Sequence, residues 1–374
     1  MKYKFEDIIF NITEKKKPVE EDKYNYIGLE HLESGNLFIS KWGSDTAPEG
    51  EKIVMKKGDV LFGKRRAYQK KVAISPIDGI FSAHGMVLRP KEDVICKEFL
   101  PFFISSETFL NEAIRISVGG LSPTVNWKDI KELKFDLPSL AEQKVLAEKL
   151  WAAYEVKQSY LKMIDATQEM VKSQFIEMFG TSESNDKGWP VSTFGERFNI
   201  TSGGTPDTQN ESYWNGDISW IGSNMCQNCI LKANDGKYIT KEGLDHSSAK
   251  IYKRDTVLVA LVGATIGKVA YLQFETATNQ NVAGIEVKDK NEYEPFFLYY
   301  LLQNMYNRFF MLGMGKFKMA SLGFIKSLPL LIPPIEQQRH FVKIAKQADK
   351  SISELRKSVD AIDKVIKSLI NENL

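Results

Sequence analysis

The chain has 374 residues, of which 43% are hydrophobic and 26% are charged, with a formal net charge of +2. These values are typical of a folded globular protein, and they exclude a disordered chain or one that is basic over its whole surface. No run approaches about 18 uncharged apolar residues and the N-terminus lacks the apolar core of a signal peptide, so we expect a cytoplasmic protein without a membrane span.

Residues 1–136 have the pattern of short strands separated by turns. Runs rich in Val, Ile, Leu and Phe are bounded by Gly, Asn, Asp and Pro, which is typical of strands and tight connections. The pattern predicts strands at 26–29, 52–55, 59–62, 72–74 and 85–88. It also predicts a helix from about residue 97 to 115, followed by a Gly-rich loop at 119–123.

The strongest basic cluster of the chain extends from Glu51 to Ser75, and within it Lys64–Lys70 lies between two of these predicted strands. We expect it to form a hairpin tip. Exposed Lys and Arg side chains neutralise DNA phosphates, and Arg and Gln have the donor geometry to bind base edges. A solvated charged loop is the alternative. The candidate DNA contacts here are Lys64, Arg65, Arg66, Tyr68, Gln69 and Lys70.

Residues 137–178 recur as residues 332–374, at an offset of about 195. After the aligned openings LPSLAEQK and IPPIEQQR, each copy continues without Pro and with apolar residues at alternating steps of four and three. This spacing predicts two long helices that pair in a coiled coil, although a single amphipathic helix packed on its own domain has a similar pattern. Nine such positions are apolar in the second copy and six of nine in the first, where the exceptions are Lys157, Thr167 and Gln174.

Residues 181–331 repeat the plan of the first 136 residues. The segment 220–222 corresponds to 26–28, 254–258 to 58–62, 268–270 to 71–73, and a helix at 295–310 to the one at 99–115. Small residues and amides make up most of the candidate contacts, and Asn or Gln can pair bidentately with adenine. These candidates are Gly203, Gly204, Thr205, Asn224, Thr265, Lys268, Asn279, Gln280, Lys316 and Lys318.

The motifs in this sequence that resemble sites for catalysis, cofactors or metals are all incomplete. Residues 263–268 resemble a phosphate-binding loop, but its two Gly are one residue too close and Val269 stands where a Ser or Thr is needed. Cys226 and Cys229 have zinc-knuckle spacing, but no second cysteine pair follows. Four scattered His support no catalytic triad, and neither a methyltransferase motif nor an S-adenosylmethionine loop is recognisable. We expect no catalytic residue, cofactor or metal in this chain.

Several of these segments resemble the specificity (S) subunits of type I restriction-modification systems. The resemblance rests on the openings 137–143 and 332–338 and on segments 189–191, 203–206, 213–221 and 263–270. The first unit departs from the family pattern, since it lacks the Gly-Gly-Thr-Pro loop and has Lys64–Gln69 in place of the small turn. The implied α+β fold has two α/β target-recognition domains, 1–136 and 181–331. They are separated by two long antiparallel helices, 137–180 and 332–374, which form a coiled-coil spacer with a pseudo-twofold internal repeat.

The same resemblance implies a non-catalytic DNA reader. It would recognise a bipartite, asymmetric site in double-stranded DNA and direct adenine methylation and restriction by partner subunits. Those partners would be methyltransferase subunits, usually two, which carry S-adenosylmethionine, and helicase-nuclease subunits, which use ATP. Two other readings stay open at this point: a methyltransferase or nuclease that acts on its own, and a structural coiled-coil adaptor without a DNA role.

Overall fold

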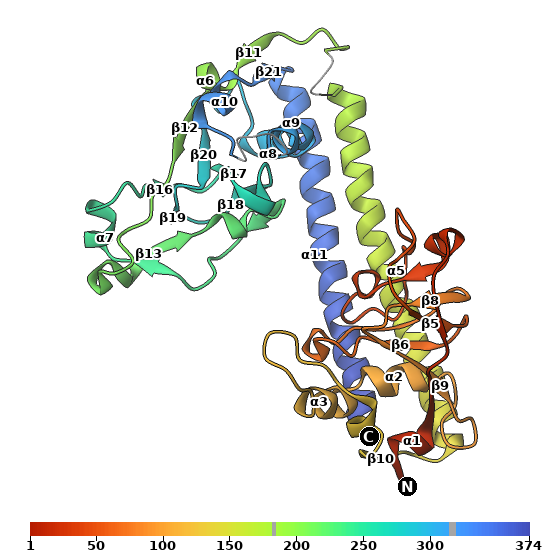
Figure 1. Ribbon diagram of the computed structural model, residues 1–374. Coiled ribbons are helices and arrows are strands. Elements are labelled where there is room, and N and C mark those ends of the chain that lie inside the picture. The colour runs from red at the N-terminus through yellow and green to blue at the C-terminus, as the bar shows by residue number, and fades with distance from the viewer. Residues whose placement is uncertain (182–184, 314–318) are drawn as a thin grey trace. The chain divides into compact units, whose positions relative to one another are not determined.

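The computed structural model describes residues 1–181, 185–313 and 319–374 (Figure 1). The chain forms two compact units, and each long helix contributes to both. Unit 1 comprises Met1–Met163 and Leu355–Leu374, and unit 2 comprises Ile164–Glu354. None of the helices in these described ranges is long and apolar enough to cross a membrane.

Unit 1 contains two four-stranded sheets. The first, in the order β2-β9-β6-β7, is antiparallel throughout and consists of Ile9–Ile12, Met86–Pro90, Val60–Phe62 and Val72–Ile74. The second, in the order β3-β5-β8-β4, consists of Lys15–Lys16, Lys52–Met55, Gly79–Phe81 and Tyr26–Ile27. In this second sheet β4 pairs parallel with β8. Strand β1 (Lys2–Lys4) pairs with β10 (Lys134–Asp136) and brings the two ends of residues 1–136 together.

Unit 2 shares most of this topology and differs at the edges of its sheets. Its larger sheet, β12-β20-β17-β18-β14, consists of Phe198–Ser202, Val282–Val287, Val257–Ala260, Val269–Leu272 and Cys229–Leu231. The smaller sheet, β15-β13-β19-β16, consists of Tyr238–Ile239, Trp214–Ile221, Thr276–Thr278 and Ile251–Tyr252. The parallel pair here is β13 with β19. Strand β11 (Val191–Thr193) pairs with β21 (Pro329–Leu331), as β1 does with β10.

The predicted strands of the first unit are present, and the correspondence between the repeats is confirmed at β4 and β13, β6 and β17, and β7 and β18. Strand β8 was missed because Asp78-Gly79 resembled a turn. The single helix predicted at 97–115 is wrong. The chain forms α2 (Leu100–Ser105) and α3 (Glu107–Arg115), because Ser106 is extended and its side chain caps α3 by accepting from the Phe109 N–H. The helix predicted at 295–310 is likewise divided at Met305 into α8 (Pro295–Asn304) and α9 (Tyr306–Gly313).

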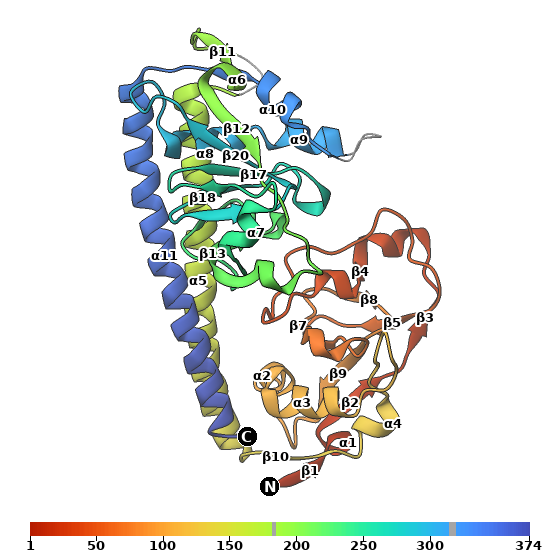
Figure 2. The same cartoon turned by 90° about the vertical axis from the view of Figure 1, so that its left-hand side faces the viewer.

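Two long helices, α5 (Leu140–Phe179) and α11 (Ile335–Asn371), run side by side in opposite directions (Figures 1 and 2). In unit 1, Leu150 and Tyr154 of α5 share a core with Ile370 of α11. In unit 2, Phe175 and Phe179 pack edge-on against Phe341. The predicted long helices with an apolar seam are therefore confirmed. At Lys157, a polar position of the seam, the buried ammonium forms an ion pair of 2.7 Å with Asp363.

The repeated glutamine of the two helix openings is fully buried and binds in the same way in each copy. The Gln143 side-chain oxygen accepts from Cys96 N, and its amide nitrogen donates to Val94 O and Pro138 O. Gln338 accepts from Glu294 N and donates to Glu292 O and Pro333 O. Each glutamine thus satisfies three backbone groups and fixes the start of a long helix to the segment before α2 or α8.

Candidate DNA interface

The parallel strand pair of each unit positions its candidate contacts. Parallel strands end at the same edge of a sheet, so the loops that follow them lie together there. In unit 1 the ladder continues with a hydrogen bond from Ser82 N to Ile27 O, and in unit 2 with the equivalent bond from Asn279 N to Ile221 O. Ser82 therefore corresponds to Asn279, and the glycines that follow β4 and β13, Gly28 and Gly222, also correspond.

Several predicted residues of unit 2 gather at this edge. Asn279 follows β19, and Asn224 lies in the turn after β13. Gln227 connects this turn to the neighbouring hairpin, because it donates to Asn224 O and accepts from the Lys268 ammonium at 2.8 Å. On the other side the Thr205 hydroxyl donates to the Gln280 side-chain oxygen at 2.6 Å. Together these residues form an amide-rich surface, and Lys268 is the one charged residue among them. The amides can both donate hydrogen bonds to base edges and accept hydrogen bonds from them.

Gly203 and Gly204 are buried, and close packing explains why they are glycines. A Cβ atom on Gly203 would overlap Thr278, and one on Gly204 would overlap Ser248. The Trp220 indole also donates to Gly204 O. The two glycines therefore hold the loop against the sheet and bring Thr205 to the surface. Thr265 is half-buried in the turn Gly263–Thr265, and Lys316 and Lys318 lie outside the described residues.

In unit 1 the basic stretch connects the antiparallel strands β6 and β7, as predicted. Arg65 donates its backbone N–H to His84 O, and its guanidinium lies 3.3 Å from the His84 ring. Arg66 donates to the hydroxyl of Ser122, in the neighbouring loop 119–123. Tyr68 is exposed, whereas Lys64, Gln69 and Lys70 are half-buried. The hairpin tip is thus held in place by two other loops.

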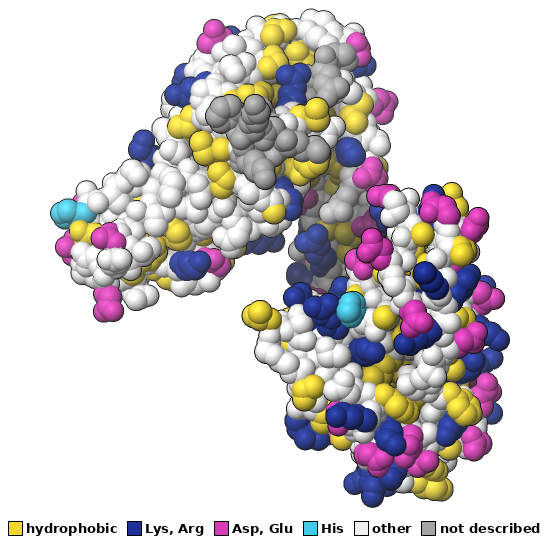
Figure 3. All heavy atoms as spheres, in the orientation of Figure 1, with side chains coloured by type: hydrophobic (Ala, Val, Ile, Leu, Met, Phe, Trp, Pro, Cys, Tyr) yellow, Lys and Arg dark blue, Asp and Glu magenta, His cyan; other side chains and the backbone are white. Residues whose placement is uncertain are grey.

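Positive charge is concentrated around this hairpin tip. Burial, and then the charge of Lys15, lowers the pKa of Lys64. Burial, followed by the charges of Arg65, Lys64 and Lys52, lowers the pKa of His84, which favours the neutral imidazole. Figure 3 shows Lys and Arg side chains gathered around a histidine on unit 1, and much of the surface of unit 2 that is visible in the same view is uncharged. Repulsion among these cations would be relieved by an anion such as a phosphate.

The two hairpins have the same length and share two left-handed positions in spite of their different sequences. Nine residues lie between paired strand positions in each, from 63 to 71 and from 260 to 268. Each contains a short 3-10 turn, and the two left-handed positions coincide: Arg66 with Gly263, and Lys70 with Gly267. The units therefore present different side chains on equivalent loops.

Sequence reasoning missed the residues of unit 1 that correspond to the amides of unit 2. Glu30 is equivalent to Asn224, and Ser82 to Asn279, while His84 lies beside Arg65. The signal was available, because aligning 26–28 with 220–222 places Glu30 opposite Asn224. The negative charge of Glu30 argues against a contact with DNA, for which cations and amides are the expected residue types.

The cysteines of unit 2 are poorly placed for metal binding or reactivity. Burial, and then the neighbouring Cys229, raises the pKa of the Cys226 thiol to about 12. Within residues 1–181, 185–313 and 319–374, no group of three or more His, Cys, Asp or Glu side chains is close enough to hold a metal ion. Cys226 packs in the small core beside the sheet.

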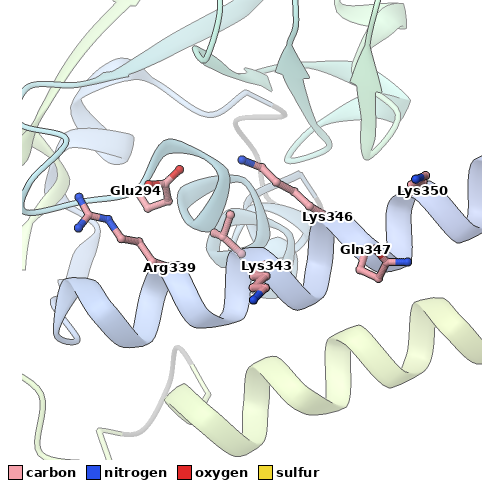
Figure 4. A pocket seen from close by; sticks show the side chains of 7 residues that line it. Glu294, Arg339, Lys343, Lys346, Gln347 and Lys350 are labelled. Carbon is pink, nitrogen blue, oxygen red and sulfur yellow. The ribbon is translucent and has the colours of Figure 1, made fainter.

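Unit 2 also has a basic hollow along α11, with a volume of about 550 Å³. Figure 4 shows the charged and amide side chains that surround it, which are Glu294, Arg339, Lys343, Lys346, Gln347 and Lys350. At the positions of α5 that correspond to Lys343, Lys346 and Lys350 the chain has Glu148, Trp151 and Glu155, and Trp151 stacks on Phe38. The hollow therefore distinguishes the α11 copy of the repeat from the α5 copy.

Comparison with known proteins gives a consistent result. The family model described as the type I restriction modification DNA specificity domain matches residues 2–159 and 186–362. A putative type I restriction enzyme MjaX specificity subunit from Methanocaldococcus jannaschii is 23% identical over 394 residues, covering 98% of this chain and 89% of that protein. The MjaIX specificity subunit of the same organism is 26% identical over 184 residues, covering 48% of this chain and 42% of that protein.

Solved structures show the same fold. The type I restriction-modification S subunit from M. genitalium has a TM-score of 0.55 and 16% identity, covering 99% of this chain and 94% of that chain. A chain from a structural study of type I R-M complex assembly and conformational transition has a TM-score of 0.55 and 19% identity, covering 100% and 97%. With two matches to the family model, one in each repeat, the chain belongs to the type I restriction-modification DNA specificity family.

Proposed function

We propose that the chain reads a bipartite, asymmetric site in double-stranded DNA, with one half read by each unit. The observation that carries this proposal is that the two units share a fold and present different side chains on equivalent loops. A duplicated scaffold with identical loops would read a symmetric site. Here a strongly basic hairpin in unit 1 corresponds to an uncharged one in unit 2, and Glu30 corresponds to Asn224.

The two surfaces favour different kinds of contact. Around Lys64–Lys70 the cations suit phosphates and guanine edges, for which Arg and Lys are the usual partners. The amides Asn224, Asn279 and Gln280 suit adenine, because a carboxamide matches its adjacent acceptor and donor in the major groove. We propose 1–136 and 181–331 as the two target-recognition domains.

The chemistry would belong to partner subunits. We propose that methyltransferase subunits, usually two, supply S-adenosylmethionine and modify adenine, and that helicase-nuclease subunits supply ATP-driven cleavage. The basic hollow along α11 is the surface that we assign to an acidic face of a methyltransferase subunit, since its cations have one carboxylate among them. A complex that acts on cellular DNA would work in the cytoplasm.

Sequencing of modified adenines tests the proposal. The chain is produced with its methyltransferase partner in cells that lack other adenine methylation, and methylated sites are mapped genome-wide. We expect one motif with two unequal halves and an unread gap. Purified chain incubated alone with S-adenosylmethionine and DNA should methylate nothing. Methylation by the chain alone would favour a self-sufficient enzyme, and an unchanged methylation pattern with and without the chain would favour a structural adaptor.

A further inference from the structure

The turns after β4 and β13 have the same local structure down to a folded-back side chain. Gly28 and Gly222 precede the 3-10 turns Leu29–His31 and Ser223–Met225, with φ and ψ of −97° and 171° in one and −96° and 173° in the other. A Cβ atom on Gly28 would overlap the Glu30 carboxyl group, and one on Gly222 would overlap the Asn224 side-chain oxygen. In both units the side chain two residues after the glycine therefore lies directly over it.

The surroundings of the two side chains also correspond. An added Cβ on Gly222 would lie 3.6 Å from the Asn279 amide nitrogen, so two amides converge there. In unit 1, Ser82 occupies the position of Asn279, and the charge of Glu30 contributes, after burial, to raising the pKa of Tyr26, to which Ser82 is hydrogen-bonded. Glu30 is exposed, as is Asn224. Both side chains thus lie at the edge where the loops of their unit converge.

A carboxylate at a DNA-binding edge needs a specific reason, because phosphates repel it. The cytosine N4 amino group offers a donor in the major groove that a carboxylate can accept. The acceptor atoms of guanine and thymine repel a carboxylate, and adenine presents the N7 acceptor beside its amino group. A carboxamide has both a donor and an acceptor, and it matches adenine instead. Replacing a carboxylate by a carboxamide at an equivalent position is therefore expected to change the preferred base.

We propose that Glu30 and Asn224 are equivalent specificity-determining residues, of which Glu30 selects cytosine in one half-site and Asn224 selects adenine in the other. This inference rests on the proposed function, since it requires that both units read DNA. It assigns a role to an acidic residue in the more basic unit, and it explains why a glycine precedes each residue by two positions.

Isosteric exchanges test it. Glu30→Gln removes the charge without changing shape, and Asn224→Asp adds one. Each variant is produced with the methyltransferase partner, and its motif is mapped beside that of the unchanged chain. We expect Glu30→Gln to convert one cytosine to adenine in one half-site, and Asn224→Asp to convert one adenine to cytosine in the other half-site. The change in preference should be about 5- to 150-fold, which is the range of a good base contact. Glu21→Gln, at an exposed acid in a different turn of unit 1, serves as the control and should leave the motif unchanged.

The outcomes separate the inference from the proposed function. Variants that methylate the original motif, with unchanged preference at every position, would overturn the assignment of Glu30 and Asn224 and leave the bipartite reader intact. Folded variants that lose binding to every sequence would also overturn it, because a change of base preference must create a new preferred site. An unchanged chain that yields no bipartite motif with its partner would refute the proposed function itself.

Discussion

Arg66 and Lys70 have left-handed backbone conformations, with φ of 55° and 51°, where the equivalent residues of unit 2 are Gly263 and Gly267. An L-residue in this region is less stable than glycine by about 1–2 kcal/mol, before the extra chain entropy that glycine loses on folding. Two long cationic side chains are thus present at positions where glycine would strain the backbone less. This supports a role for the side chains in binding and shows how to remove them without disturbing the loop.

We expect Arg66→Gly to weaken DNA binding without unfolding the hairpin. The free energy of unfolding should change by no more than about 1 kcal/mol, because relief of strain and the entropy of glycine oppose each other. If Arg66 binds a phosphate, the slope of log affinity against log salt should decrease by about 0.9. Fluorescence anisotropy across a salt series measures this slope, with Lys97→Ala as a control of equal charge change. A slope that falls equally in both variants would indicate a general effect of charge.

Gln338 allows a second test with a matched control, because the residue before it, Gln337, is an exposed glutamine. Gln338→Ala leaves one backbone N–H and two carbonyl groups without their buried partner. We expect it to lower the free energy of unfolding by about 2–4 kcal/mol. Gln337→Ala, on the exposed side of the same helix turn, should change it by less than about 0.5 kcal/mol. Urea denaturation of the full chain compares them, and equal losses would show that the buried hydrogen bonds are not the cause.

Single residues were predictable from sequence to the extent that their chemical type matched the expected contact. Asn224, Asn279 and Gln280 carry amides, so they could be named in advance, and the structure brings them to one edge of unit 2. Glu30 was missed, because its negative charge argues against a contact with DNA. Only the turn that it shares with Asn224 reveals its position. The burial of Gly203 and Gly204 was equally hidden, because it depends on Thr278 and Ser248, which lie far away in sequence.

At the scale of elements, the long helices were the easiest to predict. Their apolar seam repeats over many turns, so each apolar position supports the prediction of the next. In the structure, α5 occupies the first copy of the repeat and α11 occupies the second. Short helices lack this redundancy. The division between α2 and α3 depends on one capping hydroxyl, at Ser106, and strand β8 depends on pairing with β4 and β5 rather than on its own three residues.

The basic hollow along α11 gives a prediction for partner assembly. Its lysines Lys343, Lys346 and Lys350 are exposed, and Lys346 lies over the ring of Phe296 at 5.4 Å. Changing all three to Glu places like charges opposite an acidic partner surface, and we expect affinity for the methyltransferase subunit to fall by at least about ten-fold. Size-exclusion chromatography and calorimetry measure the assembly.

The control for this assembly test changes the same number of lysines on the other helix. Lys149, Lys162 and Lys172 are exposed on α5, and their conversion to Glu gives an equal change in net charge. Assembly should be affected much less by this second set. If both sets weaken assembly to the same extent, long-range electrostatics would explain the effect and the hollow would not be the docking surface.

At the scale of the molecule, the internal repeat made the architecture predictable. Two copies of one pattern confirm each other, so weak strand signals could be accepted when they recurred at the same offset. The differences between the two copies were harder to predict from sequence, because they lie in loops whose sequences have little in common. The shared left-handed positions of Arg66 and Gly263 are one such case, since glycine and arginine give no common signal in sequence.

Each long helix contributes residues to the hydrophobic cores of both units. The stretch of helix between these residues belongs to neither core. On α5 this stretch separates Tyr154, in the core of unit 1, from Val171, in that of unit 2. On α11 it follows Ala348 in the core of unit 2. Because the ion pair of Lys157 with Asp363 fixes the register, residues 160–166 of α5 pair with about 354–360 of α11. One heptad can therefore be removed from each helix with the seam kept in phase.

We expect the double deletion of 160–166 and 354–360 to shorten both helices by about 10 Å at 1.5 Å per residue. If the helices act as a spacer between the two half-sites, the unread gap should contract by about three base pairs, at about 3.4 Å per step of DNA. Both half-sites should keep their sequence, since no recognition loop is changed. Mapping of methylated adenines measures the gap directly. The matched control removes seven residues from α5 alone, which shifts the seam of one helix against the other and should abolish assembly or folding. A folded, active double deletion that methylates sites with the original gap would show that DNA bending or the partner subunits set the spacing instead of the helices.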